Sequence, residues 1–78
     1  MSFLKNKGMR KNAKLPKVLG KRIKKYRKRK DLSQEDVAFK IGISRVYMGY
    51  IEQGRNVPSL EILQKIARVL GVKLKDLV

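Results

Sequence analysis

The side chains in this sequence that could do chemistry are cations and hydrogen-bond donors, because the common catalytic groups are missing. The 78 residues include 21 Lys and Arg and 6 Asp and Glu, with no His and no Cys. This composition leaves no imidazole base, no thiol nucleophile and no Cys or His zinc site. We therefore expect a protein that is not an enzyme and that holds no metal or cofactor.

The positive charge is concentrated in the N-terminal part of the chain. Residues 1–30 carry 14 Lys and Arg and no acid, whereas residues 31–78 carry 7 Lys and Arg and all 6 acids, for a net charge of +15. So much unneutralised charge indicates a polyanionic partner, with nucleic acid as the first candidate and an anionic membrane surface as the second. The apolar fraction of 42% is too high for a purely disordered basic tail, so a small folded domain is expected.

No segment is predicted to span a membrane, because the apolar runs are only a few residues long and about 20 are needed. The N-terminus also lacks the continuous apolar region and cleavage pattern of a signal peptide. The absence of Cys fits a reducing compartment. We therefore expect a cytoplasmic protein, associated with the nucleoid if its partner is DNA.

The elements that would position the donors are short helices. Residues 1–15 show no apolar period and are predicted to form a flexible basic arm, which leaves residues 16–78 for the domain. Pro16 suits the first turn of a helix, and the apolar residues Leu19, Ile23 and Tyr26 follow at helical spacing. A first helix is therefore expected from Pro16 to about Lys30.

Caps and glycines predict the next two helices. A second helix begins at about Gln34, after the cap Ser33, and ends at Gly42. A third helix begins after the cap Ser44 and ends near Gly54. Only Ile43 separates Gly42 from Ser44, so the connection between the two helices is a tight turn.

The remaining residues predict two more helices. Pro58 and Ser59 start a fourth helix, which Gly71 ends, and residues 72–78 contain a short fifth one. The apolar residues expected to face the core from the second to the fourth helix are Val37, Ala38, Ile41, Ile43, Met48, Ile51, Leu60, Leu63, Ile66, Ala67 and Leu70.

The second and third helices carry a recognisable pattern. Two short helices joined by a glycine turn, with apolar residues at fixed offsets, suit a steep crossing of the two helices. The residues concerned are Leu32 to Ala38, Gly42 to Arg45, Tyr47, Met48, Tyr50 to Gly54, Pro58 to Leu60 and Ile66 to Val72. With this pattern, residues 18–78 resemble the Cro and lambdoid-repressor type of helix-turn-helix protein, also called the XRE type.

The resemblance implies an all-α, compact five-helix, lambda-repressor-like domain. Three residues depart from the family pattern. Asp31 lies where the family commonly has Gly, Gly49 lies inside the third helix, and Lys73 replaces the usual Ser cap of the last helix.

The resemblance also implies that the third helix, about residues 44–53, is a recognition helix that enters the major groove of DNA. With Met48 and Ile51 on the buried side, the helical wheel independently turns Val46, Gly49, Tyr50 and Gln53 outward, with Arg45 beside them. An Arg can donate two hydrogen bonds to guanine O6 and N7. The residues predicted to contact bases are Arg45, Val46, Gly49 and Tyr50.

Three of these residues, and the neighbouring Tyr47, have a second interpretation. Val46 is either a tolerated surface residue or a contact for a thymine methyl group. Tyr50 either reaches bases or stacks on the first helix, and Tyr47 either contacts DNA or packs against the second helix. Gly49 costs about 1 kcal/mol relative to Ala in a helix interior, which favours a close approach of its backbone to DNA.

Phosphate contacts are expected from donors at helix ends, where backbone N–H groups are free. The predicted residues are Gln34, Ser44, Tyr47, Gln53, Arg55 and Asn56, and the resemblance implies this role for Gln34, Ser44 and Gln53. For Ser44, capping and phosphate binding are compatible roles. Glu52 would be repelled by phosphates, and the resemblance implies a structural ion pair between Glu52 and Arg27.

These features together predict a sequence-specific regulator that binds double-stranded DNA, acting on a palindromic operator as a homodimer at least when bound to DNA. The apolar residues at the C-terminal end are Val69, Val72, Leu74, Leu77 and Val78. We expect Leu70, Leu74 and Leu77 to close the core of the single subunit, and the remaining ones to form the dimer surface together with the fourth helix. Two alternatives remain open. One is a charge-driven binder of RNA or an anionic surface through the basic N-terminal third, and the other is the antitoxin of a toxin–antitoxin pair.

Overall fold

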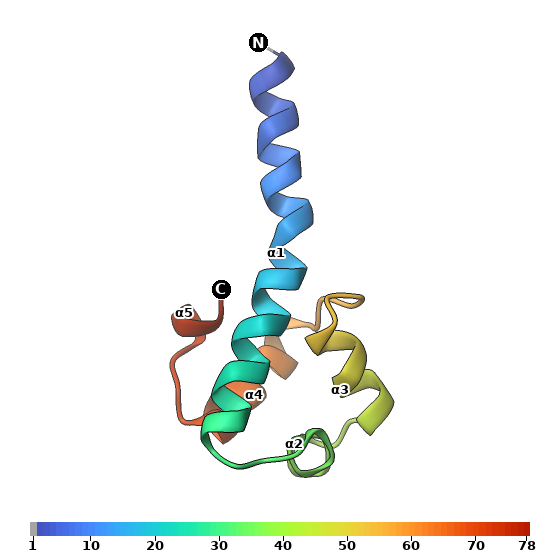
Figure 1. Cartoon of the computed structure of the whole chain (residues 1–78), viewed down its shortest axis with the longest axis vertical. Helices are drawn as coiled ribbons and strands as arrows, with labels where there is room; N and C mark the ends of the chain where they lie inside the picture. Colours follow the sequence, from blue (N-terminus) through green and yellow to red (C-terminus); the bar gives the residue numbers. More distant parts are fainter. Residues whose placement is uncertain (1) are drawn as a thin grey trace.

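The computed structural model describes the backbone of residues 2–78 and the side chains of residues 15–78 (Figure 1). Within this range the chain forms five helices and no strand: α1 (Ser2–Arg29), α2 (Gln34–Ile41), α3 (Arg45–Glu52), α4 (Leu60–Leu70) and α5 (Leu74–Leu77). The four shorter helices gather around the C-terminal half of α1. The predicted all-α, five-helix domain is confirmed. None of the described helices is long and apolar enough to cross a membrane.

Helix α1 begins at Ser2, so the predicted start at Pro16 is wrong. Pro16 lies inside the helix, and the N-terminal half of α1 extends beyond the other helices (Figure 1). An apolar period signals a buried face, whereas Lys, Arg, Leu, Met and Ala favour a helix even where no face is buried. The side chains of the predicted arm up to residue 14 lie outside the described residues. The division into an arm and a domain stays a prediction.

The predicted serine caps are confirmed. At the start of α2, Ser33 Oγ accepts a hydrogen bond from the Asp36 N–H at 2.9 Å, and Asp36 Oδ2 accepts one from the Ser33 N–H at 2.8 Å. The bond from the Ser33 backbone, and then the one involving its side chain, lower the pKa of the Asp36 carboxyl. Ser44 and Ser59 cap α3 and α4 by accepting from the N–H three residues further on.

The two departures at helix ends have visible consequences. Asp31 follows α1 with a φ of 56°, the left-handed conformation in which glycine is the least strained residue. Lys73 cannot cap α5 as a serine would, and Asp76 Oδ2 instead accepts from the Lys73 N–H at 2.9 Å. The first departure introduces backbone strain, and the second is compensated by a carboxylate in the first turn.

The core lies where α1 and α4 face the other helices. Tyr26 and Ile43 are half-buried at its edge. Leu60 was predicted to face the core, but it is 60% exposed because it is the first residue of α4 and lies beyond the buried part of that helix. The buried apolar residues are Leu19, Ile23, Val37, Ala38, Ile41, Met48, Ile51, Leu63, Ile66, Ala67, Leu70 and Leu77.

Gly20 marks the point at which α1 crosses the end of α3. A Cβ atom at this position would lie 2.6 Å from the carbonyl oxygen of Ile51 and nearer still to that of Glu52. Backbone atoms cannot turn aside as a flexible side chain can. Any larger residue at position 20 would therefore push α1 away from α3.

We predict that Gly20→Ala destabilises the protein by about 3 kcal/mol, because the strain of separating the helices exceeds the gain of about 1 kcal/mol in helix propensity. Gly49→Ala is the matched control. A Cβ at Gly49 would meet only Gln34 Oε1, at the ordinary contact distance of 3.5 Å. This control should be as stable as the wild type or up to about 1 kcal/mol more stable. Urea unfolding, monitored by circular dichroism, measures the free energy of unfolding of both variants. Equal stability of the two variants would contradict the close crossing of α1 and α3.

Candidate nucleic-acid interface

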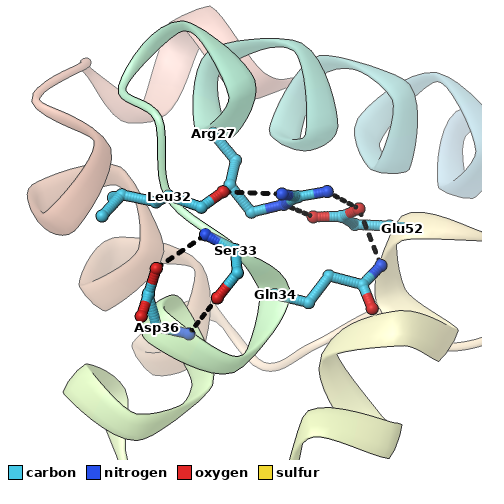
Figure 2. A network of polar contacts seen from close by, with 6 residues as sticks. All are labelled: Arg27, Leu32, Ser33, Gln34, Asp36 and Glu52. Atoms are coloured by element: carbon cyan, nitrogen blue, oxygen red, sulfur yellow. Dashed lines mark hydrogen bonds and ion pairs between the residues drawn. The ribbon is translucent and has the colours of Figure 1, made fainter.

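A buried ion pair holds α3 against α1 (Figure 2). Arg27 Nε donates to Glu52 Oε2 at 2.6 Å, and Arg27 Nη2 donates to Glu52 Oε1 at 3.0 Å. The two side chains are only 9% and 2% exposed. The pair is therefore bidentate and almost completely removed from water, and it joins the residues that the family resemblance implied.

Two further hydrogen bonds extend this pair to α2. Arg27 Nη1 donates to the carbonyl oxygen of Leu32 at 2.7 Å, in the segment between α1 and α2. Gln34 Nε2, from the first residue of α2, donates to Glu52 Oε1 at 3.0 Å (Figure 2). The hydrogen bond to Glu52 raises the pKa of Arg27 despite the opposing effect of burial. The cluster links α1, α2 and α3 and has no buried polar side-chain atom without a partner among the described residues.

The outer face of α3 carries three of the four predicted base-contacting residues. Arg45 and Val46 lie in its first turn and are exposed, with Val46 at 57%. Tyr50 lies one turn further along and is also exposed. These side chains come from one short helix and can enter a groove together, because a major groove admits a single helix.

Gly49, the fourth predicted residue, is not exposed on this face, so the prediction that it is accessible there is wrong. It is buried, and the nearest side-chain atom to a Cβ placed there is Gln34 Oε1. Gln34 reaches from α2 across α3 to bond with Glu52, and it covers Gly49 on the way. The helical wheel considered α3 alone and could not include this side chain from α2.

Tyr50 and Arg55 form a unit that sequence reasoning missed. The Arg55 guanidinium carbon lies 5.2 Å from the centre of the Tyr50 ring, within the range of a cation–π interaction. Tyr50 is thus paired with the segment that follows α3. Tyr47 is half-buried and packs against the core, in agreement with the interpretation that it packs within the domain.

The candidate phosphate donors surround this face. Ser44 Oγ accepts from the Tyr47 N–H at 3.0 Å and keeps its hydroxyl hydrogen free to donate. The first N–H groups of α2 and α3 have no partner within their helices, as is general for helix N-termini. Gln53, Arg55 and Asn56 are exposed at the other end of α3. Gln34 has one amide hydrogen engaged by Glu52 and a second one left for another acceptor.

We predict that Arg27→Ala or Glu52→Ala lowers stability by about 3 kcal/mol, because each leaves a buried charge without its partner. Replacing both residues by apolar ones should recover much of that loss. A double-mutant cycle measured by urea unfolding gives the coupling energy. The exposed pair Glu61–Lys65, 3.8 Å apart, is the control and should show a coupling below about 1 kcal/mol. A coupling near zero for Arg27 and Glu52 would reject their stabilising role.

Comparison with known proteins shows which family has this arrangement of helices. A sequence profile described as Helix-turn-helix matches residues 23–77. The chain is 45% identical over 56 residues to an uncharacterized HTH-type transcriptional regulator of Methanocaldococcus jannaschii, covering 72% of this chain and 85% of that protein. It is 38% identical over 61 residues to the HTH-type transcriptional regulator SinR of Bacillus subtilis, covering 77% of this chain and 55% of SinR.

Solved structures agree with these sequence matches. The restriction-modification controller protein C.AhdI from Aeromonas hydrophila superimposes with a TM-score of 0.77 at 38% identity, covering 85% of this chain and 98% of that protein. The profile match includes α2, the turn, α3 and the Arg27–Glu52 pair that fixes α3. This chain therefore belongs to the XRE-type helix-turn-helix family of DNA-binding transcriptional regulators.

Proposed function

We propose that this protein acts by occupying an operator in double-stranded DNA, with α3 in the major groove. The observation that carries the proposal is the exposed face of α3, where Arg45, Val46 and Tyr50 are accessible together and Arg45 lies at the N-terminus of the helix. Helix N-termini favour anions, so they suit the phosphates on either side of a groove. The ion pair behind α3 supports the same role, because a fixed helix presents its side chains in one orientation.

The residues at this face divide into two roles. Arg45 is the leading base reader, since it combines an exposed guanidinium with a place in the first turn of α3. Val46 and Tyr50 contact neighbouring base edges. Phosphates are held by residues that flank α3, namely Gln34, Ser44, Gln53, Arg55 and Asn56, and the cations of residues 1–30 add affinity that does not depend on sequence.

We predict that Arg45→Ala relaxes base preference at one position in each half-site and costs about 1–3 kcal/mol of binding free energy. Asn56→Ala should weaken binding to all sequences alike, because a phosphate contact carries no base information. Arg55→Ala should weaken binding to all sequences too, and through its contact with Tyr50 it should also alter preference at the base pair that Tyr50 contacts. Selection of bound sequences from a random duplex pool, followed by titration of the preferred site, measures both effects. Unchanged discrimination in the Arg45 variant would refute its role as a base reader.

The same titration separates this function from the charge-driven alternative. Binding to the selected site should survive an excess of random duplex or RNA if α3 reads bases. A protein that binds only through its net charge would instead be displaced by either competitor.

We further propose that the protein binds a palindromic operator as a homodimer. One recognition helix reads only a few base pairs, and a two-fold dimer places two of them on half-sites about one helical turn apart. The net charge of +15 on each subunit opposes association at low salt, so the dimer forms most readily on DNA.

We predict two subunits per operator at saturation. Sedimentation of the complex with a duplex carrying one full palindrome measures this stoichiometry. A duplex in which one half-site is scrambled serves as the control and should bind one subunit with lower affinity. A single subunit on the intact palindrome would refute the dimer.

A further inference from the structure

The side of α1 that faces away from α3 carries a row of cations. Helix α1 packs against both α3 and α5, and Figure 1 shows these two helices on opposite sides of it. Gly20 marks the side of α1 that meets α3. At 3.6 residues per turn, Arg22, Lys25 and Arg29 lie about 140–180° around the helix from Gly20. All three side chains are exposed, and we call them the distal row.

Contacts within the protein hold the distal row in place. Lys25 Nζ lies 5.5 Å and the Arg29 guanidinium carbon 5.6 Å from the centre of the ring of Tyr26, which is half-buried against the core. Arg22 Nη1 donates to the backbone oxygen of Val78, the residue after α5. A Lys head group has three N–H donors and an Arg head group five, so each cation keeps donors for a ligand. Because these side chains are already restrained, they lose less entropy when they bind one.

Little negative charge offsets the distal row. Helix α1 contains no acidic residue, and the adjoining acids in the sequence are Asp31, beyond the end of α1, and Asp76 in α5. Asp76 is half-buried and accepts a hydrogen bond from the Lys73 N–H. The exposed Lys75 of α5 adds a further cation. Like charges gathered on one side of a helix repel each other, so this side favours an anionic ligand.

The distal row points away from any duplex that α3 holds. Such a duplex lies against the outer face of α3, and α1, a cylinder about 10 Å across, stands between α3 and the row. The cations on the α3 side of α1 are different ones. A Cβ at Gly54, directly after α3, would lie 2.9 Å from Lys17 Cγ. Lys24 lies two turns beyond Lys17 on the same side, about 40° around the helix from Gly20.

We propose that the distal row binds the phosphate backbone of a second DNA duplex, so that the protein joins two duplexes. This inference rests on the proposed function, because the first duplex is the operator held by α3. The total charge supports it. DNA-binding proteins contact on the order of 6–10 phosphates. A net charge of +15 on each subunit exceeds that number, so positive charge remains when the operator is occupied.

The chemistry of the row favours a duplex over other polyanions. Unpaired bases bind by stacking on free aromatic rings, but the Tyr26 ring is half-buried and in contact with two cations. A helix that lies on a membrane inserts its apolar face, whereas Leu19 and Ile23 of α1 are buried in the core. A phosphate backbone requires only exposed cations. Residues 22–29 extend over about 10 Å of helix, which is the axial length of about three successive phosphates in one strand.

The test measures binding of a second duplex to the complex of protein and operator. A fluorescent duplex with the selected site is saturated with protein, and its capture by an immobilised duplex of random sequence is followed at several salt concentrations. The double variant Lys25→Gln/Arg29→Gln removes two cations of the distal row. The matched control Lys17→Gln/Lys24→Gln removes two exposed cations from the α3 side of the same helix.

We predict that the variant of the distal row binds the second duplex about tenfold more weakly, with a slope of log affinity against log salt that is shallower by about 2. Two lost phosphate contacts release about two fewer counterions, which accounts for the change in slope. The control complex, also loaded to saturation, should capture the second duplex within about twofold of the wild type, because its substituted residues face the first duplex.

Operator affinity is measured first and separates the two proposals. A wild type that prefers no duplex sequence would refute the proposed function. If the wild type binds its operator but the saturated complex captures no second duplex, or if both variants lose capture equally, the assignment of the distal row is overturned. Stronger capture of the complex by single-stranded RNA, or by vesicles of anionic phospholipid, would also overturn it. Operator affinity and thermal stability of the distal-row variant should match the wild type, because its substituted side chains are exposed and face away from α3.

Discussion

The contact between Arg27 and Glu52 is the constraint on which the arrangement of this small domain depends. Two charged groups with almost no access to water destabilise the folded state unless they are paired and their hydrogen bonds are formed. Here the guanidinium donates twice to Glu52 and once to the carbonyl oxygen of Leu32, and Gln34 supplies a further donor. Because the partners come from α1, α2, α3 and a connecting segment, none of these elements can turn without breaking a buried charged contact. Gly20 makes the arrangement possible by letting α1 approach the backbone of α3 closely.

The exposed face of α3 follows from this constraint. Glu52 lies at the end of α3, so holding its carboxylate also fixes the rotation of α3 about its axis. The side chains that remain outside, Arg45, Val46 and Tyr50, are those opposite the buried Met48 and Ile51. The Glu52 carboxylate is thereby neutralised behind α3, and its charge is kept away from approaching phosphates. The cation–π contact of Arg55 with Tyr50 limits the motion of both side chains at the exposed end of the face.

The distribution of apolar residues has a second consequence. A chain of this size buries only part of its surface, and its core is formed by the inner faces of its helices. Four apolar side chains at the edge of that core stay exposed, namely Leu15, Val18, Val57 and Leu60.

The sequence by itself determined the features that depend on neighbours within a few residues. The caps at Ser33, Ser44 and Ser59, the ends of α2 and α4 and the buried faces of the middle helices all follow from local hydrogen bonds and helical periodicity. Only the tertiary structure decided which side chains from distant elements share one space. Gly49 is buried because Gln34 crosses it, Leu60 is exposed because nothing packs over the start of α4, and Val69 and Val72 serve the core. Helical periodicity gives the direction in which a side chain points, whereas burial depends on what another element places there.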